Sequence, residues 1–342
     1  MLFRSREDQP IAVPAQPKLL DRLRQASRLR HYSRRTEEAY VGWIRRFIVF
    51  HGKRHPREMG EPEVTRFLTS LAADRQVSAS TQNQALSAIL FLYEVVLGRR
   101  LAWMGEIVRA QRPVRLPVVL SRDEVALLLS RLRGPVWLMA ALMYGAGLRL
   151  LECAELRVKD LNVDRGELTI RDGKGGKDRV TMLPATLKGP LLDHLARVRA
   201  QHEVDLTAGR GSVALPGALR AKYPNAPMEW AWQWVFPATR FYVDQATGER
   251  RRHHLHESVL QRAVKDAARV AGISRPATCH SLRHACATHL LEAGVDLHTI
   301  QRLLGHKDLN TTSRYIQLTR HTEMGPDSPL DLLERFAPPR QE

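Results

Sequence analysis

Apolar residues recur with a helical period through the first third of the chain. One face, at spacings i, i+3, i+4, i+7 and i+8, consists of Tyr40, Trp43, Ile44, Phe47 and Ile48. Two further helices are predicted over residues 61–73 and 78–97, and the second holds a nearly all-apolar stretch, as a helix central to a small bundle would. The pattern from Lys18 to Trp103 therefore predicts a four-helix unit.

The pattern changes after residue 107. Residues 108–120 hold two prolines and three arginines without a helical period, which indicates a linker. Ser121 and Glu124 form a capping-box pattern ahead of an apolar run, so a second domain is predicted to begin at residue 121. The apolar residues 135–144 predict a buried helix that ends at Gly145-Ala-Gly147.

The second domain mixes helices with a few strands. Residues 167–171 and 179–183 predict two strands joined by a glycine-rich turn at 172–178. Helices are expected at 185–203 and 256–271, and several short helices at 280–315, whereas 204–240 is irregular. The predicted fold class is mainly α with a small antiparallel β-sheet. The predicted divisions are a flexible tail (1–16), a helical domain (17–107), a linker (108–120), a second domain (121–320) and a C-terminal tail (321–342).

Composition indicates the kind of partner that the protein binds. The chain carries 53 Lys and Arg against 36 Asp and Glu, a net charge of +17, and residues 1–120 alone carry 21 against 11. Such a field favours a polyanion, most simply nucleic acid, over a merely solvated basic surface. Three cysteines without close spacing give no disulfide framework, which suggests a reducing compartment. The N-terminus lacks an apolar signal core, and the longest apolar run, 14 residues, is too short to span a bilayer. We expect a cytoplasmic protein with no membrane or small-molecule partner.

Six side chains of the second domain suit chemistry on a phosphodiester. They are Arg149, Lys174, His280, Arg283, His306 and Tyr315. Arginine stays protonated and grips phosphate with parallel N–H donors. A tyrosine is a poor nucleophile near neutral pH unless cations or a base assist it, and a lysine can protonate the departing oxygen. Such a set needs no metal and no cofactor. Taken singly, each residue also has an ordinary structural interpretation, and the glycine-rich turn lacks the Walker A pattern.

The order and spacing of these motifs resemble the tyrosine recombinase (phage integrase) family across most of residues 18–320. The matching segments are Gly147–Glu152, Gly173–Lys177, His280–His284, Leu303–His306 and Tyr315.

That resemblance implies a role for each matched residue. Arg149 and Arg283 would clamp the phosphate, His280 and His306 would handle protons or bind phosphate, and Tyr315 would be the nucleophile. Lys174, or alternatively Lys177, would be the general acid. The resemblance also implies a helical core-binding (SAM-like) domain, a catalytic domain that clamps DNA with it, a 3′-phosphotyrosine intermediate without ATP or metal, and four protomers acting together. The apolar segment 329–336 would allow the C-terminal tail to exchange between protomers.

An aromatic stretch within residues 204–240 indicates a particular group within this family. Trp230, Trp232, Trp234 and Phe236 alternate, which predicts one shared side of an extended segment. A hydrophobic edge tucked against the domain is the ordinary alternative, although aromatics beside cations also stack unpaired bases. The stretch resembles the additional segment of integron integrases. This implies recombination of gene-cassette attC sites, bound as folded single-strand hairpins, with duplex attI sites.

Candidate DNA contacts follow from charge and from this resemblance. They are Arg34, Arg35, Arg45, Arg112, Arg115, Lys222, Trp232, His253 and His254. A metal site at His253, His254 and His256 is disfavoured because no Cys or carboxylate pattern completes it. The alternatives are an Xer-like or phage-type recombinase on duplex sites, a non-catalytic DNA-binding protein, and a type IB topoisomerase. A metal-dependent nuclease would need a carboxylate cluster.

Overall fold

The chain forms two compact units, residues 1–115 and 116–342, each with its own apolar core. The computed structural model describes residues 17–74, 77–101, 118–173, 177–216, 219–245 and 247–306, together with 308, 312 and 313. The predicted tails at 1–16 and 321–342, with the apolar segment 329–336, lie outside the described residues, as do residues 108–117 of the predicted linker. The predicted domain bounds stay predictions.

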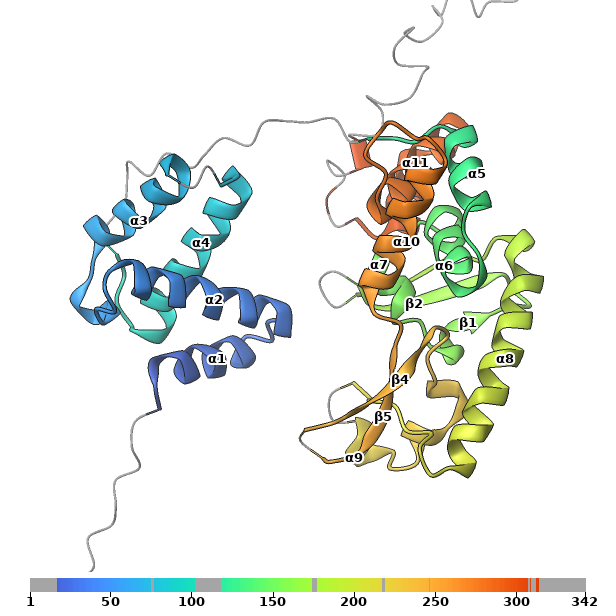
Figure 1. The fold of residues 1–342 in the computed structure, drawn as a ribbon, viewed down its shortest axis with the longest axis horizontal. Helices are drawn as coiled ribbons and strands as arrows, with labels where there is room; N and C mark the ends of the chain where they lie inside the picture. Colours follow the sequence, from blue (N-terminus) through green and yellow to red (C-terminus); the bar gives the residue numbers. More distant parts are fainter. Residues whose placement is uncertain are drawn as a thin grey trace, which may run out of the picture. The chain divides into compact units, whose positions relative to one another are not determined.

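The first unit is the predicted helical bundle (Figure 1). Its elements are α1 (Leu19–Leu29), α2 (Arg34–Phe50), the 3-10 turn η1 (Pro56–Glu58), α3 (Glu61–Ala73), α4 (Ala79–Phe91) and the π-helical turn η2 (Leu92–Val96). Ser33 caps α2 by accepting a hydrogen bond from the Thr36 amide. The apolar face of α2 packs against α1, α3 and α4, and Ile44 and Phe47 are fully buried. The predicted amphipathic helix is confirmed.

The second unit is mostly helical, as its sequence predicts. Its helices are α5 (Arg122–Ser130), α6 (Gly134–Gly145), α7 (Leu150–Ala154), α8 (Lys188–Thr207), α9 (Leu219–Lys222), α10 (Glu257–Val270), α11 (Cys279–Glu292) and α12 (Leu297–Leu304). The capping box of Ser121 and Glu124 is present at the start of α5. The buried helix α6 contacts α5, α10 and α11, because its apolar residues point to all sides. Among the described residues, no helix is both long and apolar enough to cross a membrane.

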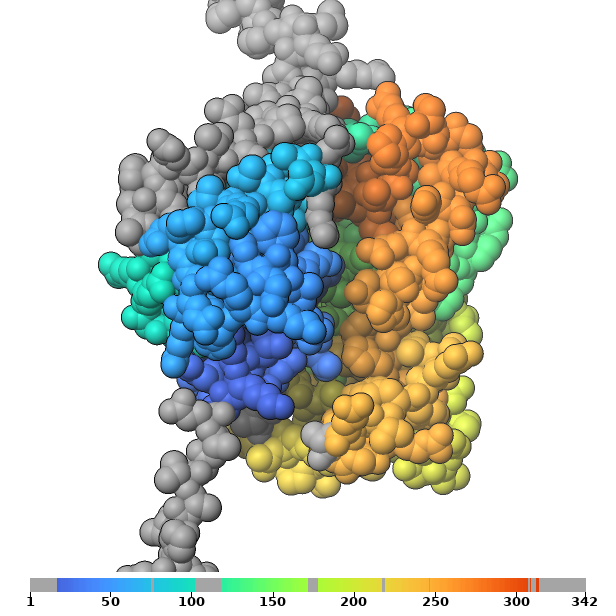
Figure 2. Space-filling view, turned by 60° about the vertical axis from the view of Figure 1, so that its left-hand side comes forward, coloured from blue at the N-terminus to red at the C-terminus, as the bar shows by residue number. Residues whose placement is uncertain are grey.

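Two small antiparallel sheets complete the second unit. The first has the order β1 (Leu161–Asn162), β2 (Glu167–Gly173), β3 (Lys177–Met182), and the second pairs β4 (Pro237–Val243) with β5 (Arg250–His254). Short 3-10 turns are η3 (Val158–Asp160), η4 (Ala185–Leu187), η5 (Ala226–Met228) and η6 (Trp230–Trp232). Within this unit, β4, β5 and α9 lie at the end away from α11, beside one end of α8 (Figure 1). Figure 2 shows one face of this unit, with the C-terminal helices at one end and the β4–β5 region at the other.

The structure departs from the sequence-based expectations at three places. The hairpin of β4 and β5 was not predicted, because Arg250 to His254 carries polar residues on both strand faces and gives no period-2 signal. The short strand β1 was also missed. Leu120, placed in the predicted linker, is fully buried in the core of the second unit, so the domain's packing begins before the capping box.

Candidate active site

Arg149 is the N-cap of α7 and lies two residues after a left-handed glycine. Gly147 has φ +64°, and a Cβ there would come within 2.5 Å of the Leu304 side chain, so glycine is needed both for the turn and for the close packing. The Arg149 amide donates to Glu152 Oε2 at 2.8 Å, and its guanidinium donates to Glu152 Oε1 at 2.6 Å and to the Gly305 carbonyl at 3.2 Å. About a quarter of the Arg149 side chain (26%) remains exposed.

Arg283 approaches the same place from inside the domain. It lies on α11, and its side chain is 1% exposed. Its guanidinium donates to the carbonyls of Gly147 and Leu304 and lies 3.7 Å from Glu152 Oε2. The two predicted phosphate clamps therefore lie together. Arg149 is partly open to solvent, and Arg283 lies beneath the surface.

His280 and His284 form a pair on α11. Their ring centroids are 4.3 Å apart. The two rings lie together because residues four apart on a helix share a face. Desolvation, together with the charges of Arg283 and Arg149, lowers the pKa of His280, whose side chain keeps an exposed part. Desolvation and the neighbouring His280 lower the pKa of His284 to about 4.

His306 follows α12 across a left-handed glycine, Gly305, with φ +64°. Its Nδ1 lies 2.8 Å from the hydroxyl of Thr312, which is fully buried. Desolvation and the charges of Arg283, Arg149 and Arg179 lower the pKa of His306 to about 3. The ring is therefore neutral at physiological pH, and its Nδ1 pairs with the Thr312 hydroxyl.

Sequence reasoning assigned no role to Glu152 or Arg179. Arg179 in β3 donates from both terminal nitrogens to the Glu152 carboxylate, at 2.9 and 2.6 Å, and from Nε to the Leu303 carbonyl at 3.0 Å. Burial by itself would raise the pKa of Glu152, but hydrogen bonds from Arg179 and Arg149 lower it to about 2. Glu152 is the third residue of α7 and accepts a hydrogen bond from the Arg149 amide, which is one half of a capping box. A glutamate at that position of a predicted helix start is the signal that could have identified it. Arg179 gave no local signal, since its partners are distant in sequence.

Several predicted residues fall outside the part of the chain that the structure describes. Lys174 and Tyr315 are among them, as are Arg112 and Arg115. For Lys177 only the backbone is described, paired with Gly173 at the ends of β2 and β3. Because β3 packs against α12 and carries Arg179, the strand that follows Lys174 is joined directly to the Arg149–Glu152 cluster.

The aromatic stretch does not form the predicted extended segment. Trp230 to Trp232 is a 3-10 turn, while Trp234 and Phe236 are buried, so the four rings do not share one side. Packing decides this arrangement, because Trp234 donates to the Arg252 carbonyl of β5 and Phe236 stacks on His194 of α8. Trp232 stays partly exposed, with the Lys159 ammonium 3.0 Å from its ring centroid. The alternative of a hydrophobic edge packed against the domain therefore holds for Trp234 and Phe236.

The two candidate histidines next to this stretch differ in access. His253 is exposed, and its ring stacks on Trp234 with centroids 6.0 Å apart. His254 is buried, its Nδ1 pairs with the Leu255 carbonyl at 2.9 Å, and desolvation lowers its pKa. The ring of His254 has no open face on which a DNA base could stack. His254 is therefore corrected as a candidate DNA contact. Lys222, at the end of α9, is exposed with its ammonium 5.3 Å from the Tyr223 ring.

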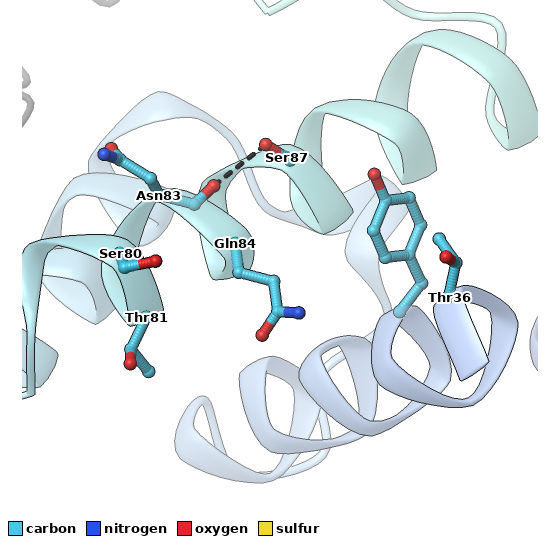
Figure 3. Close-up of a pocket in the computed structure, with 7 residues that line it drawn as sticks. Thr36, Ser80, Thr81, Asn83, Gln84 and Ser87 are labelled. Carbon is cyan, nitrogen blue, oxygen red and sulfur yellow. Dashed lines mark hydrogen bonds between the residues drawn. The ribbon is translucent and has the colours of Figure 1, made fainter. Parts of the chain in front are cut away.

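The first unit presents basic and polar side chains on its surface. Arg34, Arg35 and Arg45 of α2 are exposed, and Arg34 pairs with Glu38 at 3.1 Å. A hollow of about 460 Å³ lies between α2 and α4, as Figure 3 shows. Hydroxyl and amide groups line it: Thr36, Tyr40, Ser80, Thr81, Asn83, Gln84 and Ser87. Such donors and acceptors suit phosphate oxygens and base edges.

Metal-ligating side chains do not gather in the described part of the chain, where no three His, Cys, Asp or Glu residues are placed to hold one ion. His254 instead lies 3.8 Å from Glu155, and His256 caps α10.

Comparison with known proteins covers nearly the whole chain. The family model "Phage integrase family" matches residues 119–321, and "Phage integrase, N-terminal SAM-like domain" matches residues 19–103. An Escherichia coli protein named "Integrase/recombinase" is 49% identical over 316 residues, which cover 92% of this chain and 94% of that protein. The fold resembles XerH site-specific recombinase bound to a palindromic difH substrate, with a TM-score of 0.58 and 20% identity over 88% of this chain and 82% of that one. It also resembles a lambda integrase tetramer bound to a Holliday junction, with a TM-score of 0.55 and 18% identity over 87% and 76%. The predicted fold class is confirmed.

Proposed function

The chain belongs to the phage integrase family of tyrosine recombinases, enzymes that break and rejoin DNA, and within that family we propose that it is an integron integrase, because its aromatic stretch within residues 204–240 resembles the additional segment of that group. In this proposal it inserts and excises gene cassettes by recombining attC, bound as a folded single-stranded hairpin, with duplex attI. Two features support the proposal: the Arg149–Glu152–Arg283 cluster at the end of α12, and the partly exposed Trp232 beside Lys159.

The proposed reaction is a metal-free transesterification at Tyr315. The Tyr315 hydroxyl would give its proton to His280 as its oxygen forms a bond to phosphorus. The bond from phosphorus to the 5′-oxygen breaks, and Lys174 gives that oxygen a proton. A 3′-phosphotyrosine and a free 5′-hydroxyl result, and a second DNA's 5′-hydroxyl reverses the step on a new partner. The energy of the broken bond is retained in the covalent link, so no ATP is consumed. Lys177 is the alternative acid.

The residues of the cluster would stabilise the charge that develops on the phosphate. Arg149 can reach a non-bridging oxygen directly because a quarter of its side chain is exposed, and Arg283 adds charge from beneath. His306 is neutral, because its pKa is about 3. If Thr312 donates to Nδ1, the His306 Nε2–H can donate to the phosphate without carrying a charge. His280 is exposed beside them and would move a proton.

The substrate part of the proposal depends on Trp232. Its ring is partly exposed and has cations next to it, the combination on which proteins stack unpaired bases. His253 is exposed on the neighbouring strand β5. These two side chains would hold bases turned out of an attC hairpin, and Lys222 would contact its backbone.

The remaining parts of the proposal concern assembly. Residues 17–107 would bind DNA through Arg34, Arg35, Arg45 and the polar hollow between α2 and α4, and residues 108–120 would carry Arg112 and Arg115 across the backbone. Residues 121–320 would hold the catalytic site and clamp the DNA together with the first domain. We expect four protomers on DNA, as in the lambda integrase tetramer, exchange of the tail at 321–342, and a cytoplasmic location.

A second candidate is a recombinase of duplex sites, such as an Xer-like or phage-type enzyme. The burial of Trp234, Phe236 and His254 favours it, because much of the aromatic stretch is used for packing.

A binding comparison separates the two candidates. Trp232→Ala should weaken binding to a hairpin with extrahelical bases by about 5- to 150-fold, since stacking of one base is worth roughly 1–3 kcal/mol. Binding to an unbulged duplex should change little. Trp230→Ala is the matched control, because Trp230 lies in the same 3-10 turn and is also partly exposed. An equal loss on hairpin and duplex would exclude base stacking and favour the duplex-site candidate.

A further inference from the structure

Arg179 joins three parts of the second unit that are far apart in sequence. It extends from β3, and its side chain is only 10% exposed. It holds Glu152 through two parallel hydrogen bonds and donates its third to the Leu303 carbonyl near the end of α12. Gly305 packs directly against it, since a Cβ at that position would lie 2.7 Å from Arg179 Cδ. One side chain therefore couples β3, α7 and the end of α12.

Three consecutive carbonyls at the end of α12 each accept a hydrogen bond from a different arginine. Arg179 donates to Leu303, Arg283 to Leu304 and Arg149 to Gly305. Carbonyls in the last turn of a helix lack partners within the helix, and this end carries partial negative charge, so guanidinium groups stabilise it. The chain leaves this end toward His306. The position of α12 is thereby linked to the positions of the two proposed phosphate clamps.

The charges within this cluster suggest separate tasks for the arginines. Three guanidinium groups surround one carboxylate, and Arg179 is the largest contributor among the groups that lower the pKa of Glu152. If Arg179 neutralises Glu152, then Arg149 and Arg283 leave two positive charges for the phosphate. A phosphodiester carries one negative charge and gains roughly one more as the fifth oxygen bonds to phosphorus. The net charge of +2 carried by three guanidinium groups and one carboxylate would match that developing charge.

We propose that Arg179 is a positioning residue for DNA cleavage. It acts through Glu152 and α12: it fixes the carboxylate that orients Arg149, and it holds the helix end that leads to His306. Arg179 does not contact the DNA. This inference rests on the proposed function, because it requires that Arg149 and Arg283 bind the scissile phosphate.

The test compares Arg179→Lys with a matched control, Arg252→Lys. Arg252 makes an equivalent two-bonded pair with the buried carboxylate of Asp205, and its side chain is 11% exposed. That pair joins β5 to α8 and does not touch the cluster. Both lysine variants keep the positive charge but lose the paired geometry. Circular dichroism melts identify a temperature at which the native chain and both variants are folded.

Cleavage is measured at that temperature as single-turnover formation of the covalent adduct, with protein in excess and a suicide DNA substrate. Arg179→Lys should cleave about 10- to 100-fold more slowly at unchanged DNA affinity, because a small misplacement of positioned groups costs rate and not binding. Arg252→Lys should cleave at the native rate.

A second substrate separates positioning of charge from loss of structure. A methylphosphonate at the scissile position replaces one charged oxygen by methyl, so the reacting group needs less positive charge. The defect of Arg179→Lys should shrink several-fold on this substrate. A native cleavage rate in Arg179→Lys, or an equal defect on both substrates, would overturn the inference. Failure of the proposed function would look different, because the native chain itself would then form no adduct through Tyr315.

Discussion

Glu152 is predicted to contribute to stability in a way that depends on pH. Its side chain is 9% exposed and lies among three guanidinium groups. Its pKa of about 2, against an ordinary value of 4.5, corresponds to about 3 kcal/mol in favour of the folded state at neutral pH. Glu152→Gln removes the charge and leaves the arginines uncompensated. We therefore expect the free energy of unfolding of the second unit to fall by about 3 kcal/mol at pH 7.

The sign of the pH dependence follows from a lowered folded-state pKa. The contribution of Glu152 is complete well above pH 4.5 and is lost as the pH falls toward 2. At pH 3.5 roughly 60% of it should remain, so the native chain and Glu152→Gln should differ less there than at pH 7. Urea denaturation followed by circular dichroism at both pH values measures this difference.

A matched control is available on α8. Glu203 pairs with Arg199 at 3.3 Å, and both side chains are more than 60% exposed. Glu203→Gln should change the free energy of unfolding by no more than about 0.5 kcal/mol at either pH, because exposed ion pairs contribute little. Native stability of Glu152→Gln at pH 7, or a loss of the same size at pH 7 and pH 3.5, would refute the electrostatic account of the cluster.

Two further predictions concern the second and first units. Thr312→Val removes the hydroxyl that pairs with His306 Nδ1. The variant should slow single-turnover cleavage about 10-fold while DNA affinity stays unchanged. A native cleavage rate would show that the hydrogen bond does not orient the ring. Phe47→Ala empties a fully buried position of the helical bundle and should destabilise that unit by about 3–5 kcal/mol in thermal unfolding; a loss below about 1 kcal/mol would contradict the packing described for α2.

The helices were the part of the fold most readily predicted from sequence, because their apolar period is local. The amphipathic α2 and the buried α6 both follow the pattern of their own residues. The hairpin of β4 and β5 escaped prediction because its partners are fixed by distant contacts. Arg252 of β5, for example, pairs with Asp205 of α8, which is 47 residues away along the chain. Sequence reasoning also took the alternation from Trp230 to Phe236 for an extended segment, whereas the packing of Trp234 and Phe236 turns the chain.

In the candidate site too, contacts between residues distant in sequence could not be predicted. Arg149, Arg283 and His306 could be singled out from motif spacing, and the structure brings them together at the end of α12. Arg179 could not, because its partners Glu152 and Leu303 are 27 and 124 residues away along the chain. A residue that acts by holding distant segments together becomes visible only when those segments are placed in space.

The central claim is that Tyr315 attacks the DNA backbone without a metal. Its most direct test is covalent adduct formation on a nicked suicide DNA substrate, with a chelator present throughout. The native chain should form a denaturation-resistant protein–DNA adduct, as should Tyr223→Phe, whose tyrosine lies on an exposed surface away from the cluster. Tyr315→Phe should form none. An undiminished adduct with Tyr315→Phe would contradict the claim.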